Sequence, residues 1–226
     1  MQKQAAVLAF ALVNIAGIAA AQQPAALVQE LHVVNVSRVQ EKGEFQATLA
    51  LRSRGDEETK GQSIGGWLDF ELGLTDRLQV ALETAVVDKS SMTAKVKEVE
   101  VGLAYELVRR PSANLIVAVN CRPGAPENFE LHVMNGWRAG RGEIHSGVVM
   151  EMDEGQRNVQ FDLAGVWPWR DWRGTLEVRH QSHSEALSIT PGVAWVRGGM
   201  QLGIGVGLPR HGQSRPPVML SSTVEF

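Results

Sequence analysis

Residues 200–208, with the sequence MQLGIGVGL, carry an apolar residue at every second position. Side chains of an extended strand point alternately to opposite faces, so Leu202, Ile204 and Val206 share one face. The other face holds Gln201 and glycines. The stretch therefore predicts a strand with one apolar face and one face that is polar or has no side chain.

The same period of two extends in both directions from this stretch. It divides residues 44–226 into twelve alternating segments that are separated by turn residues. An even number of such segments, each of about ten residues, is typical of transmembrane β-barrels of the bacterial outer membrane. A secreted soluble β-sandwich also has alternating strands, but here the apolar face is unbroken on every segment. The sequence therefore predicts an all-β protein, a transmembrane antiparallel up-and-down barrel of about twelve strands.

The aromatic residues support this interpretation, because they gather at one end of the predicted strands. Aromatic side chains form belts at membrane interfaces, and the longer loops of outer-membrane barrels are extracellular. Both rules give the same orientation if the two chain termini lie in the periplasm, with the aromatic end on the periplasmic side. The residues concerned are Tyr105, Trp137, Trp167, Trp169, Trp172, Trp195 and Phe226.

The composition excludes several other classes of protein. The chain has 226 residues, of which 44% are hydrophobic and 21% are charged, so it is not disordered. Beyond residue 21, no apolar run reaches the roughly 20 residues of a transmembrane helix. The sole cysteine of the sequence, Cys121, can form neither an intrachain disulfide nor a zinc site by itself. The formal net charge of -3 argues against a nucleic-acid partner, and we expect no cofactor and no metal.

Residues 1–21 have the composition of a cleavable signal peptide. Lys3 lies near the start, an apolar run follows, and small residues precede the expected cleavage near Ala21. Export of this kind places the mature protein outside the cytoplasm. We expect it in the bacterial outer membrane, with residues 44–226 as the barrel.

Residues 22–43 do not continue the period of two. Leu27, Leu31 and Val34 have helical spacing, whereas residues 31–39 could form a thirteenth strand. A thirteenth strand would break the even number expected for such barrels. We interpret residues 22–43 as an N-terminal lead or plug segment.

Two short motifs resemble those of known outer-membrane proteins. Residues 218–226, VMLSSTVEF, resemble the C-terminal assembly signal of Gram-negative outer-membrane proteins, with Phe226 as the terminal aromatic residue. Residues 70–80, FELGLTDRLQV, are similar to a unit of strand, turn and strand in the small transporter barrels grouped with the phenol-degradation (meta-pathway) outer-membrane family. The first resemblance implies outer-membrane lipid and the barrel assembly machinery as partners. The second implies a passive channel or transporter and leaves its substrate open. We expect the barrel to let small polar or aromatic solutes pass.

The charged residues of the polar faces are candidates to line the interior of the barrel. Acids outnumber arginines among them, so the interior would mildly favour cations and polar solutes. Alternatively, facing acids and arginines cross-link neighbouring strands and fill the bore. Inward glycines such as Gly203 and Gly205 are expected to relieve crowding. The lining candidates are Arg52, Asp69, Glu71, Arg77, Glu83, Glu98, Glu100, Glu106, Arg122, Glu130, Arg138, Glu143, Glu151, Asp162, Arg173, Glu177 and Arg179.

The sequence also leaves two alternative functions open. His180 and Ser182 have a His-x-Ser spacing similar to that of lipid A deacylases, which implies an outer-membrane lipid hydrolase with this pair as catalytic residues. Residues i and i+2 lie on one face of a strand, so a base and a hydroxyl could approach each other there. A metal site of His180, His183 and Glu185 would lack an outer shell that orients its ligands. A non-transporting structural barrel is the other alternative, against which the short loops count.

Overall fold

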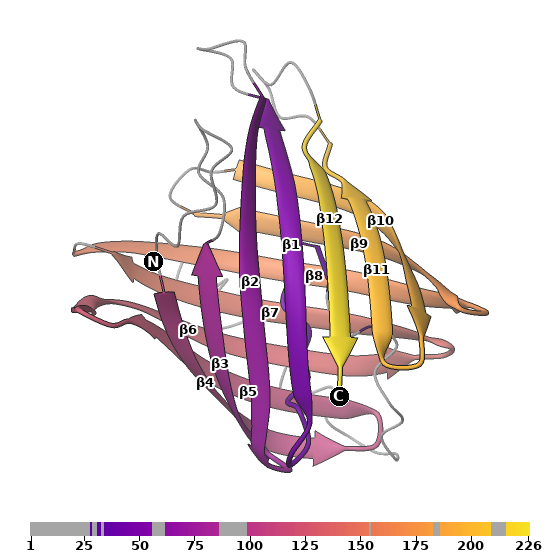
Figure 1. Cartoon of the computed structure of the whole chain (residues 1–226), viewed down its shortest axis with the longest axis horizontal. Coiled ribbons are helices and arrows are strands. Elements are labelled where there is room, and N and C mark those ends of the chain that lie inside the picture. The colour runs from indigo at the N-terminus through magenta and orange to yellow at the C-terminus, as the bar shows by residue number, and fades with distance from the viewer. Residues whose placement is uncertain are drawn as a thin grey trace, which may run out of the picture.

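The computed structural model describes residues 28, 31–32, 34–55, 62–85, 99–153, 155–182, 186–208 and 216–226. In this part of the chain, twelve antiparallel strands form one closed barrel, which confirms the predicted fold class (Figure 1). The strands are β1 (Phe45–Gly55), β2 (Gln62–Thr75), β3 (Leu78–Ala85), β4 (Val99–Arg110), β5 (Ala113–Arg122), β6 (Ala125–Ala139), β7 (Gly142–Asp153), β8 (Gln156–Trp169), β9 (Trp172–Gln181), β10 (Ala186–Arg197), β11 (Met200–Val206) and β12 (Val218–Glu225). Strands adjacent in sequence are adjacent in the barrel, and β12 pairs with β1 to close the ring.

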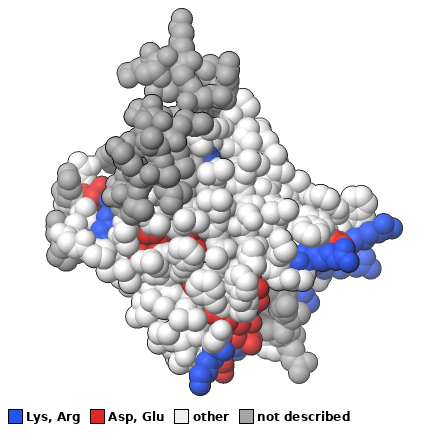
Figure 2. Space-filling view, viewed as in Figure 1, with Lys and Arg blue, Asp and Glu red and all other residues white. Residues whose placement is uncertain are grey.

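The apolar face of each strand lies on the outside of the barrel. Leu103 in β4 is 51% exposed and Leu202 in β11 is 48% exposed, whereas Gln201 and Thr223 on the inward face are 1% and 0% exposed. A water-soluble barrel would show the opposite arrangement, and this one is typical of barrels surrounded by lipid. Figure 2 shows that uncharged residues cover most of the wall in this view, while Lys and Arg gather at its projecting ends.

The two ends of the barrel differ. One end, which we call the turn end, carries tight turns at residues 76–77, 111–112, 140–141, 170–171 and 198–199 together with Phe226. Trp172 is paired there with Trp169 in β8 and with Trp195 in β10. This arrangement confirms that the aromatic residues gather at one end of the strands. The opposite end, where β1 ends and β2 begins, is called the loop end.

The N-terminal segment runs through the interior of the barrel. Residues 34–44 form neither helix nor strand. They make hydrogen bonds with side chains of β3, β5, β7, β9 and β12, which lie on different sides of the ring. Neither a helix nor a thirteenth strand forms among the described residues of 31–43, which we call the inner segment. The described residues include no helix long and apolar enough to cross a membrane.

Candidate functional site in the bore

Glu177 holds the beginning of the inner segment. This side chain lies in β9 and is buried, and its two carboxylate oxygens accept the backbone N–H groups of His32 and Val34 at 3.0 and 2.9 Å. Hydrogen bonds to an ionised acceptor are stronger than those between neutral groups. Because the inner segment lies outside the sheet, these contacts replace the ladder that pairs the N–H groups of a strand.

The ring of His32 packs against three glycines of the wall. A Cβ atom on Gly192 in β10, or on Gly203 or Gly205 in β11, would lie 2.7 to 2.9 Å from a ring atom of His32. Protein interiors do not tolerate so close an approach, so the ring occupies space that any larger residue would need. The inward glycines relieve crowding, as the sequence predicts, and the group that they accommodate belongs to the same chain. Burial lowers the pKa of His32 from 6.5 to about 4.

Ser37, in the middle of the inner segment, is bound by neighbouring strands. Its backbone N–H donates to Nδ1 of His145 in β7 at 3.3 Å, and its carbonyl accepts from the side-chain amide of Asn114 in β5. Asn114 in turn accepts the backbone N–H of Gly136 in β6 at 2.9 Å. A Cβ atom at position 136 would lie 3.1 Å from Cβ of Ser37, so glycine lets the segment approach the wall.

Gln40 joins the inner segment to the first three strands. Its backbone N–H donates to the side chain of Gln79 in β3 at 2.7 Å. Its side-chain amide donates to Gln46 in β1 at 2.9 Å and to Glu71 in β2 at 3.1 Å. Glu71, one of the predicted lining residues, is therefore occupied by the segment.

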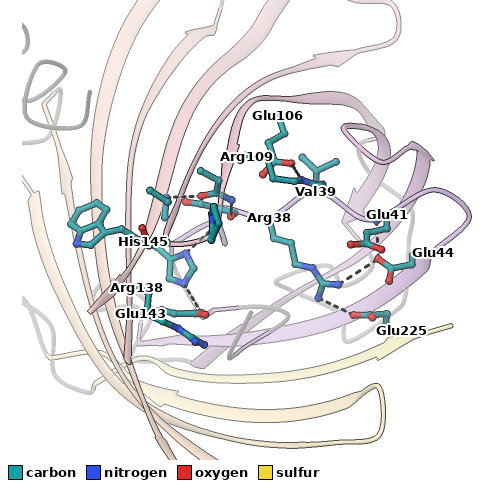
Figure 3. Close-up of a pocket in the computed structure, with 17 residues that line it drawn as sticks. Arg38, Val39, Glu41, Glu44, Glu106, Arg109, Arg138, Glu143, His145 and Glu225 are labelled. Carbon is teal, nitrogen blue, oxygen red and sulfur yellow. Dashed lines mark hydrogen bonds and ion pairs between the residues drawn. The ribbon is translucent and has the colours of Figure 1, made fainter. Parts of the chain in front are cut away.

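Arg38 links the inner segment to the seam where the barrel closes. Its guanidinium pairs with Glu44, just before β1, at 3.4 Å and with Glu225 in β12 at 3.2 Å (Figure 3). All three side chains are largely buried. The contact thus connects the segment with β12 and with the residue that leads into β1.

Apolar contacts complete the fit between the inner segment and the wall. One cluster consists of Val28, Leu31, Val34 and Val36 with Ala164 and Val166 of β8. The other consists of Val39 with Ala104, Ile116, Ala118 and Met134 of β4, β5 and β6. The inward face is therefore apolar at places where the segment lies against it, although most of that face is polar.

Two cavities lie beside the inner segment. The turn-end cavity has a volume of about 400 Å³, and Figure 3 shows charged side chains from several strands around it. Its charged lining includes Arg38, Glu44, Glu106, Arg109, Arg138, Glu143 and Glu225. The inner cavity has a volume of about 140 Å³ and lies between β2 and β6. Its charged or titratable lining consists of Arg38, Asp69, Glu71, Glu83, Glu100 and His132.

The structure places the predicted lining residues in several environments. Asp69, Glu71, Glu83 and Glu100 border the inner cavity, and Glu106, Arg138 and Glu143 border the turn-end cavity. Others contact a neighbouring side chain: Arg179 binds Asp162 through two bonds of 2.9 Å, Arg122 binds Glu100 at 2.8 Å, Asn158 binds Glu151 at 3.1 Å, and His132 contacts Glu130 at 2.9 Å. Arg77 and Arg173 lie at the turn end, Arg52 is half-buried in β1, and Glu98 lies outside the described residues.

The lining residues predicted from the sequence did not include His32, Ser37, Arg38 or His145. The first three belong to a segment without a periodic pattern, so no rule assigns a direction to their side chains. His145 does lie on the polar face of a predicted strand, which was a usable signal. What it binds depends on the position of the inner segment.

The structure does not assemble His180 and Ser182 into a catalytic pair. The His180 ring stacks on Phe161 with 6.3 Å between the ring centroids, and the Ser182 hydroxyl accepts the N–H of Val159 at 3.0 Å. No hydrogen bond joins the two residues in the described part of the chain, so the geometry does not favour a lipid hydrolase. His183 and Glu185 of the metal alternative lie outside the described residues. Within the described ranges, no group of three or more His, Cys, Asp or Glu side chains could hold a metal ion.

Comparison with known proteins finds solved structures that share the fold of this chain. No protein-family model and no curated protein matches the sequence. Among solved structures, the KdgM porin aligns with a TM-score of 0.59 and 8% identity over 79% of this chain and 99% of that one. The COG4313 outer membrane channel from Pseudomonas putida F1 aligns with a TM-score of 0.59 and 10% identity over 85% and 100%. The NanC porin aligns with a TM-score of 0.57 and 10% identity over 80% and 98%. At these identities, the comparisons show that the chain has the fold of outer-membrane porins and channels.

Proposed function

We propose that this protein is a passive channel of the bacterial outer membrane for small polar or aromatic solutes. The observation that carries the proposal is a closed barrel with an apolar outer face, a largely polar inner face and cavities of about 400 and 140 Å³ inside it. An outer face of this kind suits lipid, and a polar interior offers hydrogen-bonding partners to a solute. The porin and channel fold of the compared structures supports the same function.

The charge of the inner cavity supports a preference for cations. Asp69, Glu71, Glu83 and Glu100 border it, and Arg38 is the arginine among its described lining residues. Ionised carboxylates that line a pore attract cations and repel anions. The KdgM porin has been solved in complex with oligogalacturonate, an anionic sugar chain. In the present protein, the carboxylates that border the inner cavity argue against an anionic ligand.

The N-terminal segment would act as a plug that restricts the flow of solute. The contacts of Glu177, His145 and Gln79 with the inner segment support this role, because they hold it across the bore. The plug would be residues 22–43 of a chain whose signal peptide is cleaved near Ala21. Solutes would then pass at a low rate unless the segment moves.

The remaining partners follow from the sequence motifs. Residues 218–226 would guide the barrel to its assembly machinery, with Phe226 as the terminal signal. Residues 70–80 form the hairpin of β2 and β3, as expected, and support a relation to the phenol-degradation family of transporter barrels. Deleting Phe226 should reduce the amount of heat-labile barrel in outer-membrane fractions while leaving export across the inner membrane intact.

Ion conductance of the refolded protein in a planar bilayer tests the function. A change of gel mobility on boiling first establishes that a folded barrel is present. We expect small current steps and, under a salt gradient, a reversal potential of the sign given by cation selectivity. Replacing Glu83 and Glu100 with glutamine should reduce that potential. A folded and inserted barrel that carries no current, or one that selects anions, would contradict the proposal.

A further inference from the structure

Two residues that line the turn-end cavity each have a buried polar atom that lacks a hydrogen-bond partner among the described residues. They are Oγ of Ser37 and Nε2 of His145. Each of these residues is only 4% exposed. Leaving such an atom unsatisfied is unfavourable, because it has lost its hydrogen bonds to water, and a native structure rarely keeps one without a use. Two such atoms in residues that line one cavity point to a ligand that would satisfy them.

The state of the His145 ring follows from its contact with the inner segment. Nδ1 accepts the backbone N–H of Ser37, so it carries no hydrogen. The neutral ring therefore has its hydrogen on Nε2, which is a donor without a hydrogen-bond partner among the described residues. Oε2 of Glu143 lies 3.6 Å from Nε2 (Figure 3). This separation is too long for a direct hydrogen bond, but a single oxygen atom placed beside both groups can contact each of them.

A hydroxyl group matches this pair of groups. It can accept the hydrogen of Nε2 and donate its own hydrogen to the carboxylate of Glu143. An ammonium group has no lone pair for Nε2–H, and a carboxylate has no hydrogen for Glu143. The hydroxyl of Ser37 both donates and accepts, so it can bind a second hydroxyl of the same molecule.

We propose that the turn-end cavity binds a neutral polyhydroxylated solute, such as a hexose or a polyol, through His145, Glu143 and Ser37. The cavity volume of about 400 Å³ lies in the range of small-molecule sites. Glu143 and His145 belong to β7, whereas Ser37 belongs to the inner segment. A bound solute therefore joins the segment to the wall. The proposal rests on the channel function only for the route by which the solute arrives.

Equilibrium dialysis of the folded, heat-labile barrel in detergent tests the site with three hexoses that differ in charge. Glucose is neutral, glucuronate carries a carboxylate and glucosamine carries an ammonium. We expect saturable binding of glucose and weaker binding of both charged hexoses. Ser37→Ala, Glu143→Gln and His145→Asn should each weaken glucose binding about fivefold or more, because each removes or weakens one hydrogen bond. The asparagine retains an acceptor near the position of Nδ1, so the contact with the Ser37 N–H is kept.

Glu151→Gln is the matched control, since it removes the same charge from the other end of β7. It should leave glucose binding unchanged, and the gel-mobility change on boiling should be intact in every variant. The proposed site would be overturned if the wild type showed no saturable glucose binding, or if the three site variants bound glucose as tightly as the wild type. Tighter binding of glucosamine than of glucose would also overturn it. A barrel that binds glucose but carries no current refutes the channel and keeps the site. A barrel that conducts but binds no glucose refutes the site and keeps the channel.

Discussion

The wall of the barrel and the inner segment satisfy their backbone groups in different ways. In the wall, β7 and β8 pair over eleven consecutive positions, from Glu143 opposite Val166 to Asp153 opposite Gln156. In the inner segment, N–H groups of the backbone are bound by individual side chains of the wall, among them Glu177. The wall is therefore held by repeated backbone hydrogen bonds between strands, which do not depend on any single side chain. The segment depends on a few side chains, so single substitutions should displace it without unfolding the wall.

The largest effect is expected from a charge on the outer face of the wall. Leu202→Arg places a guanidinium among lipid tails and should cost about 2–4 kcal/mol of barrel stability if the position lies near the middle of the membrane. The folded fraction in urea, measured by gel mobility without boiling, checks this. Leu208→Arg is the control, because Leu208 lies beyond the end of β11. It should cost about 1 kcal/mol or less. Equal effects at both positions would contradict the assumed membrane depth.

Removing the carboxylate that holds the inner segment should release the segment and spare the wall. Glu177→Ala leaves the N–H groups of His32 and Val34 without their acceptors, which should cost the docked segment about 1.5–3 kcal/mol. We expect conductance per channel, or the time spent in the conducting state, to increase about tenfold or more. The urea midpoint of the wall should change little. If instead the wall unfolds and the current is unchanged, the segment is a structural part of the wall rather than a plug.

Adding one methyl group to the wall should weaken the contact between the His32 ring and the wall. Gly203→Ala adds a Cβ atom that would lie 2.7 Å from the ring and 2.6 Å from Oγ of Ser221, and overpacking of this kind costs about 1–3 kcal/mol. Current recordings should therefore show more frequent openings than in the wild type. Gly65→Ala is the matched control, since a Cβ atom there would meet nothing within 4 Å. If the control opened as frequently as Gly203→Ala, the result would contradict the inference that the inward glycines leave space for the His32 ring.

The smallest effect is a pH dependence of docking. The pKa of His32 is about 4 when the segment is docked, and a freely solvated histidine has a pKa near 6.5. A lowered pKa means that the docked state binds fewer protons, so docking is fully stable above pH 6.5 and is lost as the pH falls toward 4. At pH 5.5 the loss should be about 1.4 kcal/mol. Conductance should rise between pH 6.5 and 4 in the wild type and less in His32→Gln. An identical rise in that variant would assign the effect to other groups.

The wall could be predicted from the sequence because its rule is local. A strand with one lipid-facing side needs an apolar residue at every second position, so the faces of β4 and β11 can be read from a single stretch of residues each. The cluster of tryptophans at the turn end follows from another rule that concerns depth in the membrane. These rules identify the number of strands, the direction of each face and the end at which the turns lie.

The interior could be predicted only in part, because its arrangement depends on where the inner segment lies. The sequence placed Glu177 on an inward face, but it contained no sign that this carboxylate binds backbone N–H groups far away in the chain. Likewise, Ile116 and Met134 belong to polar faces and are apolar because Val39 packs against them. Long-range complementarity between an irregular segment and a wall has no period that a sequence pattern could reveal.

The position of Arg38 has a consequence for the order of assembly. Its two partners lie at opposite ends of the barrel sequence, since Glu44 precedes the first strand and Glu225 ends the last. The guanidinium can contact both carboxylates only after β12 has paired with β1. A chain whose seam is still open thus lacks the final anchor of its own N-terminal segment. Complete occupancy of the bore is in this way a late event, reached only when the whole chain has been delivered to the membrane and the ring has closed.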